Sequence, residues 1–421
     1  MKQQLLHTPE GVRDIYNEEC ARKNVLQENL HQVMQLYGYR DIQTPTIEFF
    51  DVFSKEIGTT PSRELYKFFD REGNTLVLRP DITPSVARSA AKYFMEEKLP
   101  LRMCYMGNTF INHSSYQGRL KETTQMGAEL IGDGSVDADA EVIALVVEAL
   151  LKAGLKDFQV SIGQIDFFKG LLEQAGIEED TEEMLRELIS NKNHFGIEEL
   201  VEEQRLSGEL KQVFLKMPEL FGGVAVLDEA KELTRNDRSL QALERLRELY
   251  EVMCCYGYEP YISFDLGMIS KYHYYTGVIF RAYTYGTGDA IVKGGRYDNL
   301  LGHFGKEAPS IGFAIVIDQL MMALSRQKID IPLSNGATLL LYEETLRQAA
   351  IPLAVGLRKT GAQVEMIRKS PDHELSEYLE YARQNRIGGI LVLRPDGQIE
   401  MIHMSDGSRQ TVNLNDLIEG V

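Results

Sequence analysis

The sequence predicts an α+β protein with a helical insertion and a small C-terminal α/β domain. Three observations support this fold class. Strand and helix patterns are mixed over the first 165 residues, strand patterns disappear from about 166 to 257, and strands alternate with helices from residue 337 onward. A chain of 421 residues is also too long for one ordinary core, so two or three domains are expected.

The N-terminal part opens with an amphipathic helix at 17–37, where apolar residues recur at three- and four-residue spacing before Gly38 ends the element. Two β-type runs, LYKFFD and TLVLRP, enclose the turn REGN and predict a hairpin. The same patterns predict further elements: a helix at 82–98, strands at 100–111 and 123–132 around a polar loop, and an apolar helix at 138–153.

The helical insertion covers about 166–257, where Glu and Leu dominate and helical periods replace strand patterns. Strands return in EPYISFDLGMI, YYTGVIFRAYTY and DAIVKGGRYDNLL, and the apolar run at 311–325 predicts a final helix. Residues 1–325 are therefore expected to form one core that carries the insertion.

A polar linker at 326–336 leads to the C-terminal domain at 337–421. Its order is strand, helix, strand, helix, strand and then two short strands. Such alternation predicts a small α/β layer with a partly parallel sheet.

Charge and composition exclude several classes of protein. With 45 basic and 63 acidic residues the formal net charge is −18, which argues against a non-specific binder of nucleic acid or anionic membranes. There is no apolar run near the roughly 20 residues that span a bilayer, and no signal-peptide core. The cysteines, Cys20, Cys104, Cys254 and Cys255, lack disulfide or metal-site spacing. We expect a cytoplasmic protein with reduced thiols and without metal, cofactor or membrane.

The sequence also lacks a phosphate-binding P-loop, a nucleophile elbow and a zinc-binding HExxH helix. Polar residues near strand ends instead suit a small cationic ligand, because carboxylates meet an ammonium or imidazolium while amides and hydroxyls orient it. Ordinary hydrogen-bonded strand residues would give the same pattern, so both interpretations stay open. The set comprises Arg79, Asp81, Thr83, Gln125, Glu129, Tyr274, Tyr275 and Tyr297.

Several separated motifs occur in a defined order: HTPEGVRDI (7–15), YGYRDIQTPTIEFFDVF (37–53), ELYKFFDREGNTLVLRPDIT (64–83), KYHYYTGVIF (271–280), KGGRYDNL (293–300) and IGFAIVIDQL (311–320). Together they resemble the catalytic core of histidyl-tRNA synthetase over about 1–165 and 259–325. The resemblance implies the class II synthetase fold, an antiparallel sheet flanked by helices. The C-terminal domain resembles that family's anticodon-binding domain.

The resemblance also implies a histidine pocket. Asp81, Thr83 and Gln125 would meet the α-ammonium group of the ligand. Glu129 and Tyr275 would meet the imidazole, and Tyr297 would line the pocket.

The family's nucleotide-binding arginines are missing. Its second motif ends a strand in Phe-Arg where this chain has Phe110-Ile111, and its third motif ends in Gly-x-Glu-Arg where this chain has Val316-Ile317-Asp318-Gln319. The family's histidine-specific pattern Arg-Gly-Leu-Asp-Tyr-Tyr corresponds here to Ser270-Lys271-Tyr272-His273-Tyr274-Tyr275. The family arginine that lies at the ligand carboxylate is thus replaced by Ser270, and Lys271 or Arg119 would have to take its role. Because arginines hold phosphates and stabilise the charge of the transition state, these losses imply that adenylation is absent.

A chain of this kind resembles the regulatory subunit of ATP phosphoribosyltransferase. The resemblance implies a subunit without catalytic residues, a homodimer within a hetero-octamer of four plus four. Its partner is the short-form catalytic subunit that performs the first step of histidine biosynthesis, and L-histidine is the expected effector. Two alternatives stay open: an active or divergent histidyl-tRNA synthetase, and a stand-alone histidine sensor or RNA-binding paralogue. The acidic balance argues against tRNA.

Overall fold

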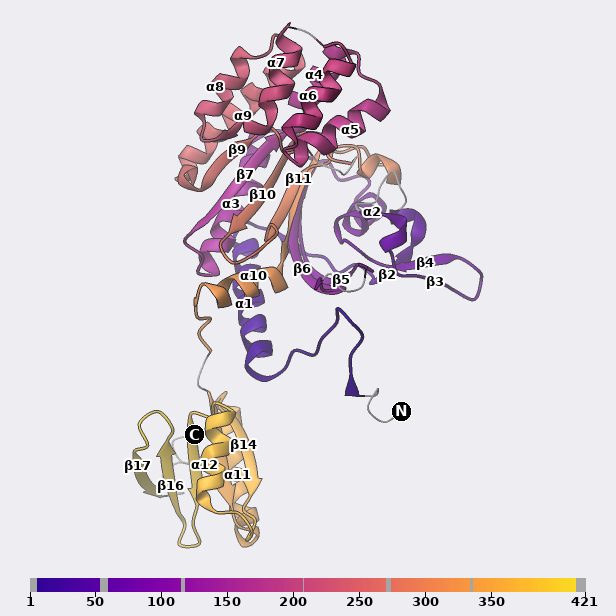
Figure 1. Ribbon diagram of the computed structural model, residues 1–421. Helices are drawn as coiled ribbons and strands as arrows, with labels where there is room; N and C mark the ends of the chain where they lie inside the picture. The colour runs from indigo at the N-terminus through magenta and orange to yellow at the C-terminus, as the bar shows by residue number, and fades with distance from the viewer. Residues whose placement is uncertain are drawn as a thin grey trace. The chain divides into compact units, whose positions relative to one another are not determined.

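The computed structural model describes residues 6–53, 60–114, 118–206, 208–269, 274–333 and 336–413 (Figure 1). The chain divides into two compact units, one formed mainly by Arg22–Ile331 and the other mainly by Pro332–Val421. Each unit has its own sheet and its own hydrophobic core.

The large unit is built on a nine-stranded sheet with the order β1-β5-β6-β12-β11-β10-β7-β9-β8. The β1–β5 and β7–β9 pairs are parallel, and the other described pairs in this sheet are antiparallel. The predicted antiparallel sheet of an α+β fold is thereby confirmed. Its strands are β1 (Arg40–Asp41), β5 (Leu101–Phe110), β6 (Glu122–Ile131), β7 (Phe158–Gln164), β8 (Phe221–Gly222), β9 (Ile262–Asp265), β10 (Val278–Thr284), β11 (Val292–Arg296) and β12 (Ser310–Val316).

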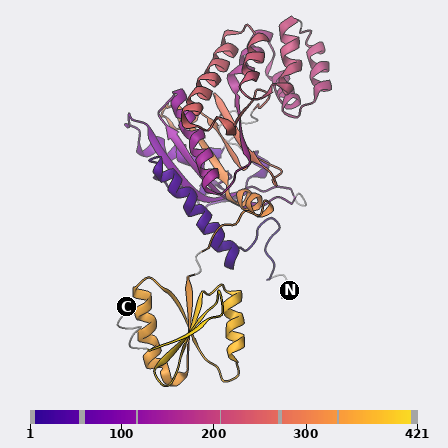
Figure 2. The same ribbon diagram turned by 90° about the vertical axis from the view of Figure 1, so that its left-hand side faces the viewer.

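Helices cover both faces of this sheet (Figures 1 and 2). On one face, α1 (Asn17–Leu36) and α3 (Val136–Lys152) belong to the main apolar core. The start of α3 is fixed by Ser135, whose side chain accepts a hydrogen bond from the N–H of Ala138. The apolar run from Val142 to Val147 explains the burial of the helix in the core. On the other face, α2 (Thr83–Tyr93) packs in a separate cluster that includes tyrosines of the candidate site.

The helical insertion follows β7 and returns to the sheet at β9. Asn236 caps its last helix by accepting a hydrogen bond from the N–H of Ser239 at 2.9 Å, and Gly257 ends that helix with a φ of 73°. Of the described helices, none is both long and apolar enough to cross a membrane. Besides the short strand β8, which the sequence did not predict, the helices of the insertion are α4 (Ile165–Ala175), α5 (Glu179–Ser190), α6 (His194–Glu203), α7 (Gly208–Lys216), α8 (Ala225–Glu232) and α9 (Asp237–Tyr256).

The predicted helix at 311–325 is wrong in its first half. Residues Ser310–Val316 form β12, a strand paired on both sides with β6 and β11, and α10 covers only Ile317–Arg326. A strand buried on both faces is apolar throughout, so periodicity cannot separate it from a buried helix.

A small three-stranded sheet, β2-β4-β3, lies beside the large one. It contains the predicted hairpin, with β3 (Lys67–Phe69) antiparallel to β4 (Thr75–Leu78), and β4 pairs on its other side with β2 (Ile47–Phe49). The small sheet is thus built from segments between residues 47 and 78, and β4 ends directly before the candidate residues Arg79, Asp81 and Thr83.

The C-terminal unit has the predicted α/β architecture. Its sheet has the order β14-β13-β15-β16-β17, in which β13 pairs in parallel with β14 and β15. Figure 2 shows the helices α11 (Arg347–Lys359) and α12 (Leu375–Gln384) on opposite faces, each above its own apolar cluster. The strands are β13 (Ala337–Tyr342), β14 (Gln363–Arg368), β15 (Gly389–Leu393), β16 (Gln398–His403) and β17 (Arg409–Asn413).

Candidate functional site

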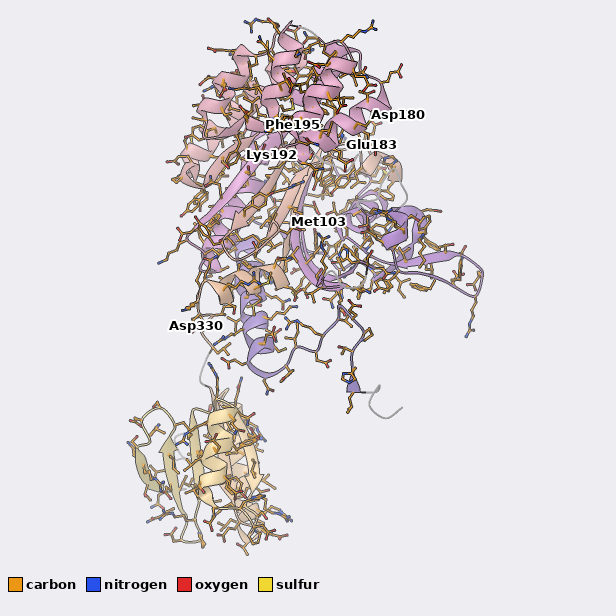
Figure 3. The ribbon with its side chains drawn as sticks, in the orientation of Figure 1. Met103, Asp180, Glu183, Lys192, Phe195 and Asp330 are labelled. Atoms are coloured by element: carbon orange, nitrogen blue, oxygen red, sulfur yellow. The ribbon has the colours of Figure 1, made fainter. Side chains whose placement is uncertain are left out.

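A buried carboxyl group forms the centre of the candidate site. Glu129, on β6, is 0% exposed, and its two oxygens accept hydrogen bonds from two hydroxyls. Thr83, at the start of α2, donates to Oε1 at 2.7 Å, and Tyr297, directly after β11, donates to Oε2 at 2.5 Å. Met103 lies opposite Glu129 in the β5–β6 register and marks this level of the sheet in Figure 3. The structure thus joins three of the predicted residues through direct contacts.

This environment changes the acidity of the carboxyl group. Burial raises the pKa of Glu129 to about 8, while the hydrogen bonds from Tyr297 and Thr83 act in the opposite direction. The nearby Asp81 carboxylate adds to the rise. At neutral pH the site therefore holds a largely protonated acid, and a cation entering beside it would favour the ionised form.

Glycines on the neighbouring strands provide the space that this site needs. Gly312 on β12 lies opposite Glu129, and a Cβ atom there would come within 1.6 Å of Glu129 Oε2. A Cβ atom on Gly295 of β11 would come within 2.8 Å of the Tyr275 ring. The close approach of both side chains therefore requires glycine at these two positions.

Asp81 and Tyr275 lie at the edge of this group. Oδ1 of Asp81 accepts a hydrogen bond from the N–H of Ile82 at 2.7 Å, and its charge raises the pKa of Glu129. The ring of Tyr275 packs on Tyr274 with 4.3 Å between centroids, and Tyr274 in turn meets Tyr297 edge to face at 6.1 Å. An aromatic wall thus borders the two carboxyl groups.

Two predicted residues take other positions. Gln125 lies four residues before Glu129 on β6, opposite Val316 of β12, and its buried Oε1 has no hydrogen-bond partner within the described part of the chain. Arg79 is buried and donates to the backbone carbonyls of Asn108 and Thr44 at 2.9 Å. Arg79 thus joins strand β5 to the loop between β1 and β2 and does not contribute a free cation to the site.

Tyr105 is a site residue that the sequence prediction missed. It is buried on β5, and its hydroxyl lies 3.5 Å from Thr83 Oγ1. Burial, followed by the charge of Glu129, raises its pKa well above the usual value. Strand alternation could have identified it, because Tyr105 shares a strand face with Met103, the partner of Glu129 in the adjacent strand.

The region of the lost arginines is occupied by internal contacts and an open polar cavity. Asp318 accepts hydrogen bonds from Lys23 Nζ at 3.0 Å and from the N–H of Thr124 at 2.7 Å. Lys271 lies outside the described residues. The cavity has a volume of about 670 Å³ and is lined by Arg63, Glu64, Asn112, His113, Ser114 and Arg119.

Comparisons with known proteins identify the family of this chain. The family model described as histidyl-tRNA synthetase matches residues 11–320. A protein of Acetivibrio thermocellus, named ATP phosphoribosyltransferase regulatory subunit, is 42% identical over 98% of this chain and 99% of its own length. A protein of the same name from Ruminiclostridium cellulolyticum is 39% identical over 98% of both chains.

Solved structures show the same relationship. The crystal structure of an ATP phosphoribosyltransferase regulatory subunit/histidyl-tRNA synthetase from Bacillus halodurans C matches with a TM-score of 0.81 and 34% identity, covering 90% of this chain and 96% of that one. Histidyl-tRNA synthetase from Nostoc sp. PCC 7120 shares the fold with a TM-score of 0.80, at 19% identity over 99% of both chains. The chain therefore belongs to the family of ATP phosphoribosyltransferase regulatory subunits, which has the histidyl-tRNA synthetase fold.

Proposed function

We propose that this chain is a non-catalytic subunit that activates a short-form ATP phosphoribosyltransferase catalytic subunit, the enzyme of the first step of L-histidine biosynthesis. One observation carries the proposal: relatives with the regulatory-subunit name match almost the whole chain at about 40% identity. The loss of arginine at positions 111, 270 and 319 supports it, because a class II site without these cations cannot stabilise a pentavalent phosphate.

The activation test uses two purified proteins. The full chain is mixed with a short-form catalytic subunit, and the turnover of ATP with phosphoribosyl pyrophosphate is measured beside size-exclusion chromatography. We expect a stable complex and a higher rate than that of the catalytic subunit alone. Two separate peaks and an unchanged rate would contradict the proposal.

We further propose that L-histidine binds beside Glu129 and acts as the feedback effector. The buried acid and the aromatic wall of Tyr274 and Tyr275 suit an imidazole, and the carboxylate of Asp81 suits an ammonium group. Feedback requires that histidine bind one state of the complex better than the other.

Calorimetry tests this site. We expect Glu129→Gln to weaken histidine binding to the full chain at least tenfold, while Tyr285→Phe, at a residue 76% exposed, leaves it unchanged. Histidinol, which lacks the carboxylate, tests whether a cation such as Arg119 meets that group. An affinity close to that of histidine would mean that no cation contacts the carboxylate. Equal affinities of wild type and Glu129→Gln would place the effector elsewhere while leaving the activation proposal intact.

A residual synthetase activity is the second candidate, since the family model that matches residues 11–320 is that of histidyl-tRNA synthetase. Histidine-dependent exchange between ATP and pyrophosphate measures it. We expect no exchange above background even at high protein concentration, and clear exchange would favour the synthetase.

We also propose that the subunit forms homodimers within a larger hetero-oligomer, a hetero-octamer of four plus four. The small sheet supports a contact between copies, because Ile47 and Phe49 on β2 are 50% and 55% exposed on one strand face. Light scattering should give twice 47.7 kDa for the isolated chain and a single chain mass for Phe49→Lys. A dimer that persists in Phe49→Lys would place the contact elsewhere.

A further inference from the structure

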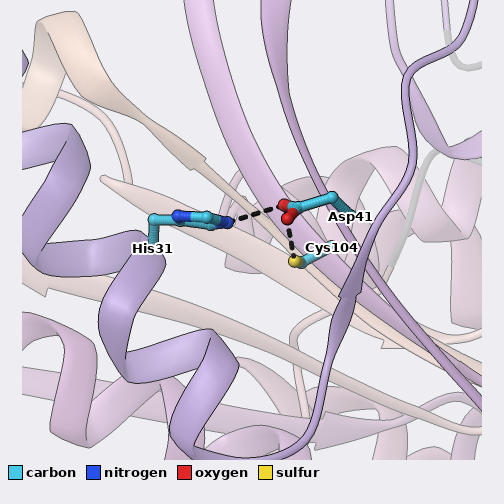
Figure 4. A group of neighbouring side chains, drawn as sticks. All are labelled: His31, Asp41 and Cys104. Carbon is cyan, nitrogen blue, oxygen red and sulfur yellow. Dashed lines mark hydrogen bonds and ion pairs between the residues drawn. The ribbon is translucent and has the colours of Figure 1, made fainter.

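Three side chains with different metal-binding atoms converge at the edge of the large sheet (Figure 4). Nε2 of His31 lies 2.6 Å from Oδ1 of Asp41, and Sγ of Cys104 lies 3.5 Å from the same oxygen. All three ligand atoms lie within 4.8 Å of one another. In the described part of the chain this is the one group of three or more His, Cys, Asp or Glu side chains with such spacing.

The fold holds these atoms in place before any ligand arrives. Asp41 of β1 and Cys104 of β5 are direct partners in the parallel register, and the N–H of Ile42 donates to the carbonyl of Cys104 at 2.9 Å. His31 lies on α1 next to Leu30, which is completely buried in the core. Two ligands therefore sit on one paired strand position, and the third sits on the helix packed beside it.

We propose that His31, Asp41 and Cys104 bind a divalent transition-metal ion of the zinc type, with water at a fourth position. An imidazole nitrogen, a thiolate sulfur and a carboxylate oxygen are the ligands that zinc uses in proteins. Tetrahedral bonds would separate N from O by about 3.4 Å and S from O by about 3.6 Å. The observed 2.6 and 3.5 Å therefore need only a small opening of the His31–Asp41 contact.

Exposure defines how the ion enters. The side chain of Asp41 is 65% exposed and that of His31 is 30% exposed, whereas Cys104 is buried. The ion therefore approaches from the solvent side, and the open fourth position faces water. This is the arrangement of an exchangeable site with three protein ligands and not of a closed structural site.

Binding has a defined proton balance. Without metal, the Cys104 thiol donates its hydrogen to Asp41. On binding, the sulfur coordinates as a thiolate, its proton passes to solvent, and His31 coordinates in its neutral form. Since the thiol proton must be displaced, the affinity should lie below that of a closed site with four ligands.

The sequence alone could not indicate this site. Positions 31, 41 and 104 match no metal-binding motif, and the sequence prediction accordingly contained no metal. Only the pairing of β1 with β5 under α1 brings the three residues together.

Cobalt(II) and zinc(II) chloride test the proposal on the full chain. Cobalt bound through a thiolate gives a near-ultraviolet charge-transfer band together with visible absorption. We expect one equivalent of cobalt with this band, displacement by zinc, and loss of the band in Cys104→Ser. His31→Ala, at a half-buried helix position, should bind cobalt at least tenfold more weakly while its circular dichroism spectrum stays that of the wild type.

The other cysteines provide matched controls. Cys254 and Cys255 are exposed neighbours that could collect metal without a built site, and Cys20 is half-buried. Serine at any of these positions should leave the cobalt band and its stoichiometry unchanged. The proposal is overturned if the wild type shows no thiolate band, or if the band survives Cys104→Ser and disappears with Cys254→Ser.

Discussion

Asp139 on α3 and Arg296 at the end of β11 form a buried ion pair, in which both contacts to Oδ1 are 2.9 Å or shorter. The second oxygen of Asp139 accepts hydrogen bonds from Arg245 of α9 at 2.6 and 2.9 Å. One carboxylate thus joins the core helix, a central strand and the helical insertion. Arg296 directly precedes Tyr297, so this ion pair also positions the hydroxyl that donates to Glu129.

Removing the Asp139 charge should destabilise the protein strongly. In Asp139→Asn the guanidinium groups of Arg296 and Arg245 lose their shared carboxylate, and that of Arg296 is almost completely buried. We therefore expect a loss of about 3–5 kcal/mol in the free energy of unfolding. Urea unfolding measures this change. The control Asp228→Asn, at a residue that pairs with Arg247 on the surface, should cost less than about 1 kcal/mol. Equal losses in both variants would contradict the central role of Asp139.

The stability of the protein should depend on pH through Glu129. Its pKa is about 8 in the folded chain and near the ordinary value of about 4.5 in the unfolded chain, so the folded state holds the extra proton between these values. The free energy of unfolding should therefore fall as pH rises through this window, by at most about 1.4 kcal/mol per unit for one proton. In Glu129→Gln, where an amide replaces the protonated acid, this slope should disappear. Parallel profiles of wild type and Glu129→Gln would show that the carboxyl is ionised throughout.

Tyr297→Phe should shift the same profile to higher pH. The Tyr297 hydroxyl donates to Glu129 and lowers the pKa of that carboxyl group, so removing the hydroxyl should raise the pKa further. The free energy of unfolding should then continue to fall up to a higher pH than in the wild type. The check is urea unfolding over the same pH series, with the exposed Tyr285→Phe as the control. A profile identical to wild type would mean that the hydrogen bond does not influence the carboxyl group.

Gly312→Ala should disrupt the site through sterics alone. The added methyl would overlap Glu129 Oε2, and we expect a loss of about 1–3 kcal/mol in stability together with weaker histidine binding. Gly389→Ala on β15 is the matched strand control, because its Cβ atom would meet the carbonyl of Ile402 at an ordinary 3.5 Å. Thermal unfolding and calorimetry compare the two. Similar effects in both would mean that glycine at 312 serves the strand in general and not the site.

The sequence predicts the parts of this fold that have clear periods or turns. The amphipathic α1, the hairpin of β3 and β4, and the alternation in the C-terminal unit follow from local patterns. β12 could not be predicted, because its apolar run at residues 311–316 has the same composition as a buried helix. The order of strands in the sheet could not be predicted from local patterns either, because β6 pairs with β12 across almost 200 residues of sequence.

The site was predictable only in part. Thr83, Glu129 and Tyr297 were named from motifs, and the structure brings their polar atoms into contact, while their role in binding histidine stays a prediction. Tyr105 carries no motif, and its importance arises from facing the same side of the sheet as Glu129. Arg79 was one of the polar residues noted near strand ends, and its guanidinium group contacts backbone carbonyls of β5 and of the loop between β1 and β2, which only the fold brings close.

The two-residue strand β8 has a mechanical consequence for the insertion. Phe221 and Gly222 pair with Asp265 and Phe264 of β9, and the N–H of Leu266 donates to the carbonyl of Leu220 at 3.0 Å. The helical insertion is therefore not free to rotate about its connections to the sheet. Rotation would strain the main-chain hydrogen bonds that join β8 to β9 and continue through β7 and β10 to β11. Since β9 connects through β7 and β10 to β11, which ends directly before Tyr297, a displacement of the insertion would act on the strands that carry the candidate site.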